Sequence, residues 1–149
     1  MNGAVLQTPR SGNLLVDNKY FITAPPTYAE YAVDQVVNVK SVPGFPVYGD
    51  GVHDDTSGIN AIISQYANCK ILFFPQGTYI VTETILIPVG TRIVGEAWSA
   101  ISATGSNFYN PTSPIPMVKV GNPGDVGVAQ ISDMLFTVAD VIQGCQLVS

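Results

Sequence analysis

Charged residues are scarce in this sequence. Only 11% of its 149 residues are charged, with 6 Lys and Arg against 11 Asp and Glu, which gives a formal net charge of −5. So few scattered cations do not build the basic surface that binds nucleic acid or an anionic membrane. With 46% hydrophobic residues, the chain is also too apolar for an intrinsically disordered protein. The composition indicates a folded protein whose partner is neither nucleic acid nor a membrane.

Leucine, glutamate and lysine are few beside valine, isoleucine and threonine, which argues against a helical bundle and favours β-structure. The 14 glycines and 11 prolines indicate many turns. No apolar run approaches the roughly 18 residues of a membrane-spanning helix, and the first residues lack the charged and apolar regions of a signal peptide. The length suits one domain with a core of its own.

Cysteine and histidine are nearly absent: the chain has Cys69, Cys145 and His53. The two cysteines form no metal-binding signature, and we interpret them as buried free thiols rather than a disulfide. With one histidine and no positioned nucleophile, a Ser-His-Asp or Cys-His site has no support. The sequence predicts neither a metal nor an organic cofactor.

The first part of the chain has no sustained hydrophobic period. The pair Pro25-Pro26 favours an extended path without a helix. We interpret residues 1–35 as a linker or arm that lays its aromatic side chains on another surface, and residues 36–149 as the folded unit. The aromatic residues of the arm are Tyr20, Phe21, Tyr28 and Tyr31.

A polar, glycine-rich loop then opens the one convincing helix. Asp54 or Asp55 can cap its first amides, and with Asp50 and Thr56 they are predicted to form a structural capping loop. Closely spaced carboxylates would also suit calcium, but capping is sufficient and we predict no metal. The apolar face of the helix recurs at helical spacing and consists of Ile59, Ile62, Ile63 and Tyr66.

Short strands broken by turns follow this helix. The expected strands are residues 71–75, 78–87, 91–94, 100–103, 117–120, 128–136 and 146–148. A sandwich or barrel would join such strands by tight hairpins, yet no Asn-Gly or Asp-Gly turn separates two alternating runs. A parallel β-helix, in which one helix covers the first stacked strands, fits this order better. Both architectures remain open on the pattern alone.

Several motifs resemble a known superfamily. The segment YGDGVHDDT (48–56), followed by INAII and FFPQGTY, is similar to the opening of pectate-lyase-like β-helices. The segments VNVKSVPGFPVYGDG (37–51), CKILFFPQGTYIVTETILIPVGTRIVGEAWS (69–99), PMVKVGNPGDVG (116–127) and ISDMLF (131–136) resemble the start of the second β-helix of family 55 glycoside hydrolases. The resemblance implies an all-β fold: a right-handed parallel β-helix with an N-terminal capping α-helix, present here as an incomplete solenoid.

Family 55 contains fungal and bacterial exo-β-1,3-glucanases built from two tandem β-helices. The resemblance implies a fragment of an extracellular hydrolase of neutral β-1,3-glucan, in which residues 1–35 join a preceding β-helix domain to the first coils at 36–149. The family's general acid lies further along than this chain reaches, so the catalytic residues stay unknown and the isolated chain is expected to be inactive. Two alternatives stay open: a non-catalytic β-helix module that binds carbohydrate or scaffolds a partner, and another pectate-lyase-like polysaccharide hydrolase or lyase.

Three residues are candidates for substrate binding. The carboxylate of Glu96 can bind sugar hydroxyls and the indole of Trp98 can stack on a pyranose ring, while Asp133 adds a second carboxylate. Structural roles compete with this interpretation: Trp98 would pack a turn, Glu96 would bind backbone amides, and Asp133 would bond to nearby backbone.

Overall fold

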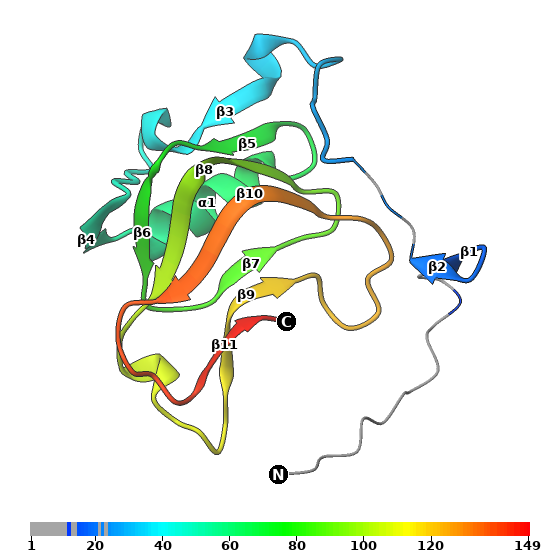
Figure 1. Ribbon diagram of the computed structural model, residues 1–149. Coiled ribbons are helices and arrows are strands. Elements are labelled where there is room, and N and C mark those ends of the chain that lie inside the picture. Colours follow the sequence, from blue (N-terminus) through cyan, green and yellow to red (C-terminus); the bar gives the residue numbers. More distant parts are fainter. Residues whose placement is uncertain (1–11, 13–14, 21, 23) are drawn as a thin grey trace.

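The computed structural model describes residues 12, 15–20, 22 and 24–149, so the predicted role of Phe21 lies outside the described residues. The described chain is mostly β-structure with one α-helix, and its six-stranded and three-stranded sheets curve around a shared interior (Figure 1). The helix is α1 (Thr56–Tyr66), and short 3-10 helices cover Val33–Gln35, Val39–Ser41 and Ser106–Phe108. The strands are β1 (Leu15–Val16), β2 (Lys19–Tyr20), β3 (Val36–Asn38), β4 (Asp50–Asp54), β5 (Ile71–Phe74), β6 (Gly77–Val81), β7 (Ile85–Ile87), β8 (Arg92–Ala103), β9 (Ile115–Val120), β10 (Gln130–Val138) and β11 (Cys145–Val148).

The strands after residue 35 form three parallel rows. Row 1 contains β3, β5 and the first parts of β8 and β10, and row 2 contains β4, β6 and the second parts of β8 and β10. Row 3 contains β7, β9 and β11. After α1, the chain passes through rows 1, 2 and 3 in that order three times. Each passage therefore hydrogen-bonds to the one before it, strand on strand.

The boundary between rows 1 and 2 differs from the prediction. The expected strands 91–94 and 100–103 are, apart from Thr91, parts of the single strand β8, which bends at Ala97 (φ 61°). In contrast, the expected strand 78–87 divides into β6 and β7. The segment Asp50–Asp54, expected as loop, is the strand β4 because it pairs with β6. Sequence patterns located the apolar segments but missed where the chain changes rows.

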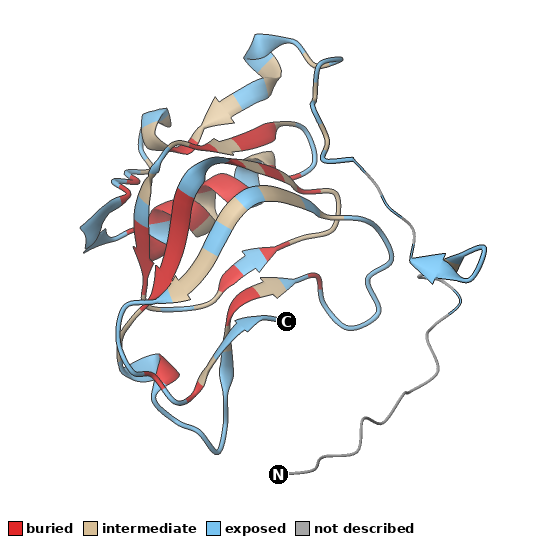
Figure 2. Cartoon of the chain, viewed as in Figure 1, coloured by how far each residue is buried: buried red, intermediate tan, exposed pale blue. Residues whose placement is uncertain are grey.

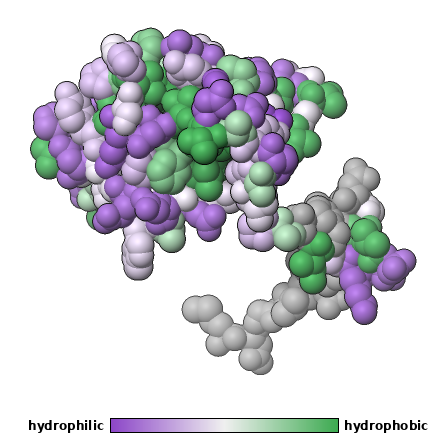
Figure 3. All heavy atoms as spheres, turned by 90° about the horizontal axis from the view of Figure 1, so that it is seen from above, coloured by the Kyte–Doolittle hydropathy of each residue, from purple (hydrophilic) through white to green (hydrophobic). Residues whose placement is uncertain are grey.

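The core lies between the three rows and α1 (Figure 2). As the helical spacing predicts, α1 buries Ile59, Ile62 and Ile63, and the helix packs against β7 and β5. Burying each such side chain contributes about 1.5–3 kcal/mol. On the outside, the face seen from above carries an apolar area surrounded by mostly hydrophilic side chains (Figure 3). No helix among the described residues is long and apolar enough to cross a membrane.

The arm contains a hairpin that the sequence pattern did not reveal. β1 and β2 pair antiparallel across Asp17 and Asn18, which adopt φ values of 51° and 64°. Two central residues with positive φ are typical of a type I′ turn, where Asn and Asp are tolerated besides Gly. The turn is missed when only Asn-Gly or Asp-Gly pairs are sought.

Two tyrosines of the arm contact row 1. Arg92 at the start of β8 lies over the ring of Tyr31, with its guanidinium carbon 5.4 Å from the ring centroid. The Tyr28 hydroxyl donates a hydrogen bond to Oε1 of Gln130, the first residue of β10, at 3.2 Å. Burial raises the pKa of Tyr28, although the nearby Arg92 charge opposes this shift. The arm thus places aromatic side chains at the beginning of two stacked strands.

The cysteines are unpaired, but the expectation that both are buried is wrong. Cys69 is exposed because it follows the end of α1, and Cys145 is half-buried in the outer strand β11. Burial raises the pKa of the Cys145 thiol.

Candidate functional site

The three predicted binding residues lie at the same bend between rows 1 and 2. In the pairing of β8 with β10, Ser132 faces Val94 and Met134 faces Ser99. Residues 95–98, which include Glu96 and Trp98, therefore lie opposite the single residue Asp133. We call Gln76, Glu96, Trp98 and Asp133 the corner cluster, since all four lie where the chain turns from row 1 to row 2.

Backbone contacts orient Glu96. Its Oε2 accepts a hydrogen bond from the Gln76 amide at 3.0 Å, and its own amide donates to Oγ of Ser99 at 2.8 Å. Ser99 is fully buried and donates in turn to the Phe74 carbonyl at 2.7 Å. The structural role foreseen for Glu96 is therefore present. Its other carboxylate oxygen has no hydrogen-bond partner among the described residues, and the side chain is exposed.

Trp98 projects from the bend with 78% of its surface exposed, so it does not pack the turn. Asp133 is exposed as well and has a φ of 55° at the irregular point of β10. Its carbonyl lies so close to Gly95 that a Cβ added to that glycine would be 2.2 Å from the oxygen. Within the described part of the chain, the Asp133 carboxylate has no hydrogen-bond partner.

A buried tyrosine supports the corner cluster from inside. Tyr79 in β6 donates its hydroxyl hydrogen to the Pro75 carbonyl at 2.6 Å, and Lys40 Nζ lies 5.3 Å from its ring centroid. The same ammonium donates to the Gln76 carbonyl at 3.0 Å. Burial, followed by the Asp55 and Glu96 charges, raises the pKa of Tyr79, which keeps it protonated. Chemically, the cluster offers an exposed indole face and two carboxylates, and no catalytic role follows from this geometry.

The predicted capping loop divides its tasks among its residues. Asp54 accepts hydrogen bonds from the Thr56 amide at 3.0 Å, from the Thr56 hydroxyl, and from the Thr82 hydroxyl at 2.7 Å. Asp55 occupies the N-cap position of α1, but its carboxylate binds the amides of Tyr48 at 2.6 Å and Gly49 at 2.9 Å. Asp54 thus serves the first helical residue, while Asp55 fixes the preceding loop.

The pKa values of the loop carboxylates are shifted in opposite directions. For Asp54, burial opposes ionisation, but the hydrogen bonds from Thr56 and Thr82 hold its pKa below the ordinary value. For Asp55, burial prevails over the two amide hydrogen bonds and raises its pKa.

The backbone amide and the ring of His53 lower the pKa of Asp50, whose Oδ2 lies 2.7 Å from Nδ1 of His53. His53 also stacks on Tyr48. No group of three or more His, Cys, Asp or Glu side chains suited to a metal occurs among the described residues.

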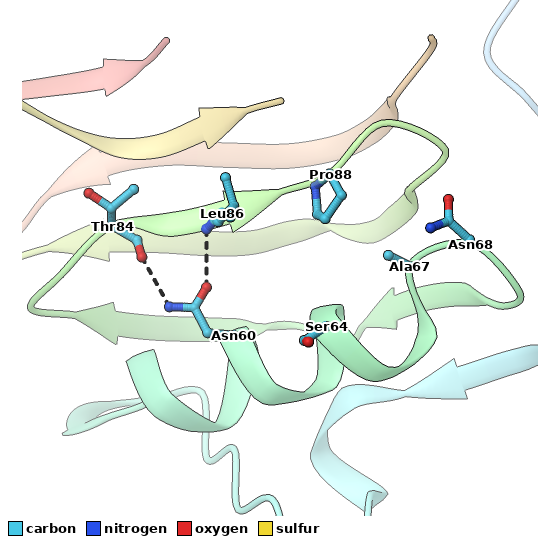
Figure 4. Close-up of a pocket in the computed structure, with 7 residues that line it drawn as sticks. All are labelled: Asn60, Ser64, Ala67, Asn68, Thr84, Leu86 and Pro88. Atoms are coloured by element: carbon cyan, nitrogen blue, oxygen red, sulfur yellow. Dashed lines mark hydrogen bonds between the residues drawn. The ribbon is translucent and has the colours of Figure 1, made fainter. Parts of the chain in front are cut away.

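A pocket that the sequence did not reveal lies between α1 and β7 (Figure 4). The Asn60 amide nitrogen donates to the Thr84 carbonyl at 3.0 Å, and its oxygen accepts from the Leu86 amide at 3.1 Å. One side chain thus pairs with the outer edge of β7. A single asparagine within a helix gives no sequence signal for this contact.

With this geometry in hand, the comparisons identify the class of protein. Residues 36–134 match the family model described as rhamnogalacturonase A/epimerase, pectate lyase-like, and the chain belongs to this family. Three curated relatives are named glucan 1,3-β-glucosidases or glucan endo-1,3-β-glucosidases and are 37–41% identical to this chain. The matches confirm the resemblance to pectate-lyase-like glucan 1,3-β-glucosidases that the motifs indicate.

Individual matches show how much is shared. Glucan endo-1,3-β-glucosidase BGN13.1 of Trichoderma harzianum is 41% identical over 143 residues, which cover 93% of this chain and 19% of the relative. Non-secreted LysM effector LysM19 of Penicillium expansum is 39% identical over 150 residues, covering 97% of this chain and 12% of the relative. The solved structure of ORF18 of Geobacillus virus E2 superposes with a TM-score of 0.59 and 28% identity, covering 77% of this chain and 23% of that one. The chain therefore spans less than a fifth of the length of these curated relatives.

Proposed function

We propose that the three rows are the first coils of a right-handed parallel β-helix and that α1 covers its first end. Three passages in constant row order, each hydrogen-bonded in parallel to the previous one, support this architecture. We further propose that residues 1–35 are an arm between domains and that the β-helix begins at residue 36. The family match, which starts at residue 36, supports this boundary, and the much greater length of the relatives leaves room for a preceding domain.

The function that the site supports best is participation in the extracellular hydrolysis of β-1,3-glucan, with the corner cluster as a sugar-binding surface. The observation that carries this proposal is the match to glucan 1,3-β-glucosidases over most of the chain. The corner cluster supplies fitting chemistry, because an exposed indole can stack on a pyranose and carboxylates can accept hydrogen bonds from its hydroxyls. A neutral polymer also suits a chain with only 11% charged residues.

A second candidate is a glucan-binding module that performs no catalysis. Two of the relatives that align with most of this chain are named LysM effectors rather than hydrolases. Moreover, one oxygen of Glu96 is engaged with the Gln76 backbone, a contact that serves orientation. Both candidates require that the corner cluster bind glucan, and they differ only in turnover.

Laminarin binding by the full chain tests the shared requirement. We expect Trp98→Ala to weaken binding about tenfold or more, as loss of an exposed aromatic anchor does. Tyr109→Ala is the matched control, because this aromatic is 48% exposed and lies outside the corner cluster; it should change binding less than about twofold. Equal binding by wild type and Trp98→Ala, or no binding by either, would remove the corner cluster as a glucan site.

Glucose release from laminarin separates the two candidates. The isolated chain should bind without turnover, because in the proposed enzyme a preceding domain completes the groove. A longer protein that contains this chain should release sugar if the hydrolase proposal is right, and only bind if the module proposal is right. Preference for an acidic pectic polymer over laminarin would overturn both in favour of the third alternative, a different pectate-lyase-like hydrolase or lyase.

A further inference from the structure

The pocket between α1 and β7 has a volume of about 320 Å³. Asn60, Ser64 and Asn68 line it from the helix side, and Leu86 and Pro88 line it from the strand side (Figure 4). This volume falls at the small end of the range of about 300–1,000 Å³ typical of ligand pockets. The pocket lies beside row 3, whereas the corner cluster lies between rows 1 and 2, so the two sites are separate.

The lining mixes polar and apolar side chains and carries no charge. No Asp, Glu, Lys, Arg or His side chain takes part in it. The Ser64 hydroxyl and the Asn68 amide have no hydrogen-bond partner among the described residues, so both can donate and accept. Asn60 is fixed by its contacts with Thr84 and Leu86, and its amide keeps one further N–H and one further lone pair.

We propose that this pocket binds a neutral, hydroxyl-rich ligand of about one sugar unit, a glucosyl residue of β-1,3-glucan. Sugar hydroxyls donate and accept at once, as Ser64 and Asn68 do, while the C–H groups of a pyranose can pack on Leu86 and Pro88. A uronic acid would bring a carboxylate to a pocket without a cation, where only neutral O–H and N–H donors would offset its desolvation. The preference for neutral ligands rests on the lining, and the choice of glucose rests on the proposed function.

A titration of the full ¹⁵N-labelled chain with laminaribiose, followed by NMR, tests this site. We expect saturable shifts of the Leu86 backbone amide and of the Asn60 and Asn68 side-chain amides, with a dissociation constant in the range of about 1–10 mM. Galacturonic acid at the same concentrations should leave these signals unmoved. Equal shifts with both sugars, or none with laminaribiose, would overturn the proposal.

Two variants locate the binding. Ser64→Ala and Asn68→Ala should each weaken the affinity about fivefold, the effect of one hydrogen bond. Gln65→Ala is the matched control, since Gln65 is exposed on the same helix but does not line the pocket. Because Ser64 is exposed, its variant remains informative if Asn68→Ala fails to fold. Unchanged affinity in both variants would place the binding elsewhere and refute the site.

The Trp98→Ala variant separates this proposal from the proposed function. The pocket shifts should persist in this variant even though laminarin binding at the corner cluster is weakened. If laminarin binds at the corner while laminaribiose leaves the pocket signals unmoved, only the pocket proposal fails. If the pocket responds and the corner does not, only the corner cluster fails.

Discussion

The two outer strands of row 3 have the same parallel partner, β9, yet they differ in how they are covered. Ile85 and Ile87 of β7 are fully buried because α1 lies against that strand. In β11, Leu147 and Val148 are 42% and 43% exposed, with β9 as the strand's only paired neighbour among the described residues. A strand in a stack of this kind buries its inward-facing side chains fully only when it is covered on both sides.

The largest expected effect follows directly from this difference. Ile87→Ala should lower the free energy of unfolding by about 3 kcal/mol, because it removes a buried side chain and leaves a cavity. Leu147→Ala in β11 is the matched change and should cost less than about 1 kcal/mol, since that side chain is already in contact with water. Urea unfolding followed by circular dichroism measures both. Similar losses in the two variants would mean that the ends of row 3 are equally well packed.

The backbone edges of β7 and β11 differ as well. Asn60→Ala would leave the Thr84 carbonyl and the Leu86 amide without the partners that Asn60 provides at 3.0 and 3.1 Å. We expect a loss of about 2 kcal/mol, the cost of partly buried polar groups that lose their partners. The control is Gln146→Ala in β11, where the side chain donates to the Val148 carbonyl at 3.3 Å on an exposed surface. Its loss should stay within about 0.5 kcal/mol, and an equal loss at both positions would show that Asn60 does not protect the β7 edge.

Local features of this fold could be predicted from the sequence, whereas contacts between distant segments could not. The face of α1 and the apolar strands were predictable, because 3.6-residue spacing and β-branched runs act locally. Three of the four corner-cluster residues were named from the sequence as separate candidates, but their place at one bend depends on the register between β8 and β10, in which four residues face Asp133 alone. The contacts of Asn60 could not be predicted from the sequence at all, since its partners lie 24 and 26 residues away. Neither that contact nor the pocket beside it leaves a local pattern.

The smallest expected effect concerns pH, which should act on Asp54 in the acid range and on Cys145 in the alkaline range. In β4, next to α1, the lowered pKa of Asp54 means that the unfolded chain binds protons more readily than the native chain. Stability should therefore fall as the pH drops from about 5 to about 2. The lowered pKa of Asp50 adds to this loss, whereas the raised pKa of Asp55 opposes it. Asp54→Asn should be less stable at neutral pH and should lose less stability in acid.

In β11, burial raises the pKa of the Cys145 thiol. The native chain then holds this proton more tightly than the unfolded chain, so stability should fall as the pH rises from about 7 to about 10. Cys145→Ser should reduce this alkaline loss without changing the acid loss, and Asp54→Asn should do the reverse. Urea midpoints measured across both pH ranges for the two variants and the wild type check the assignment. If either variant reduced the acid loss and the alkaline loss equally, the assignment of the first to Asp54 and of the second to Cys145 would be wrong.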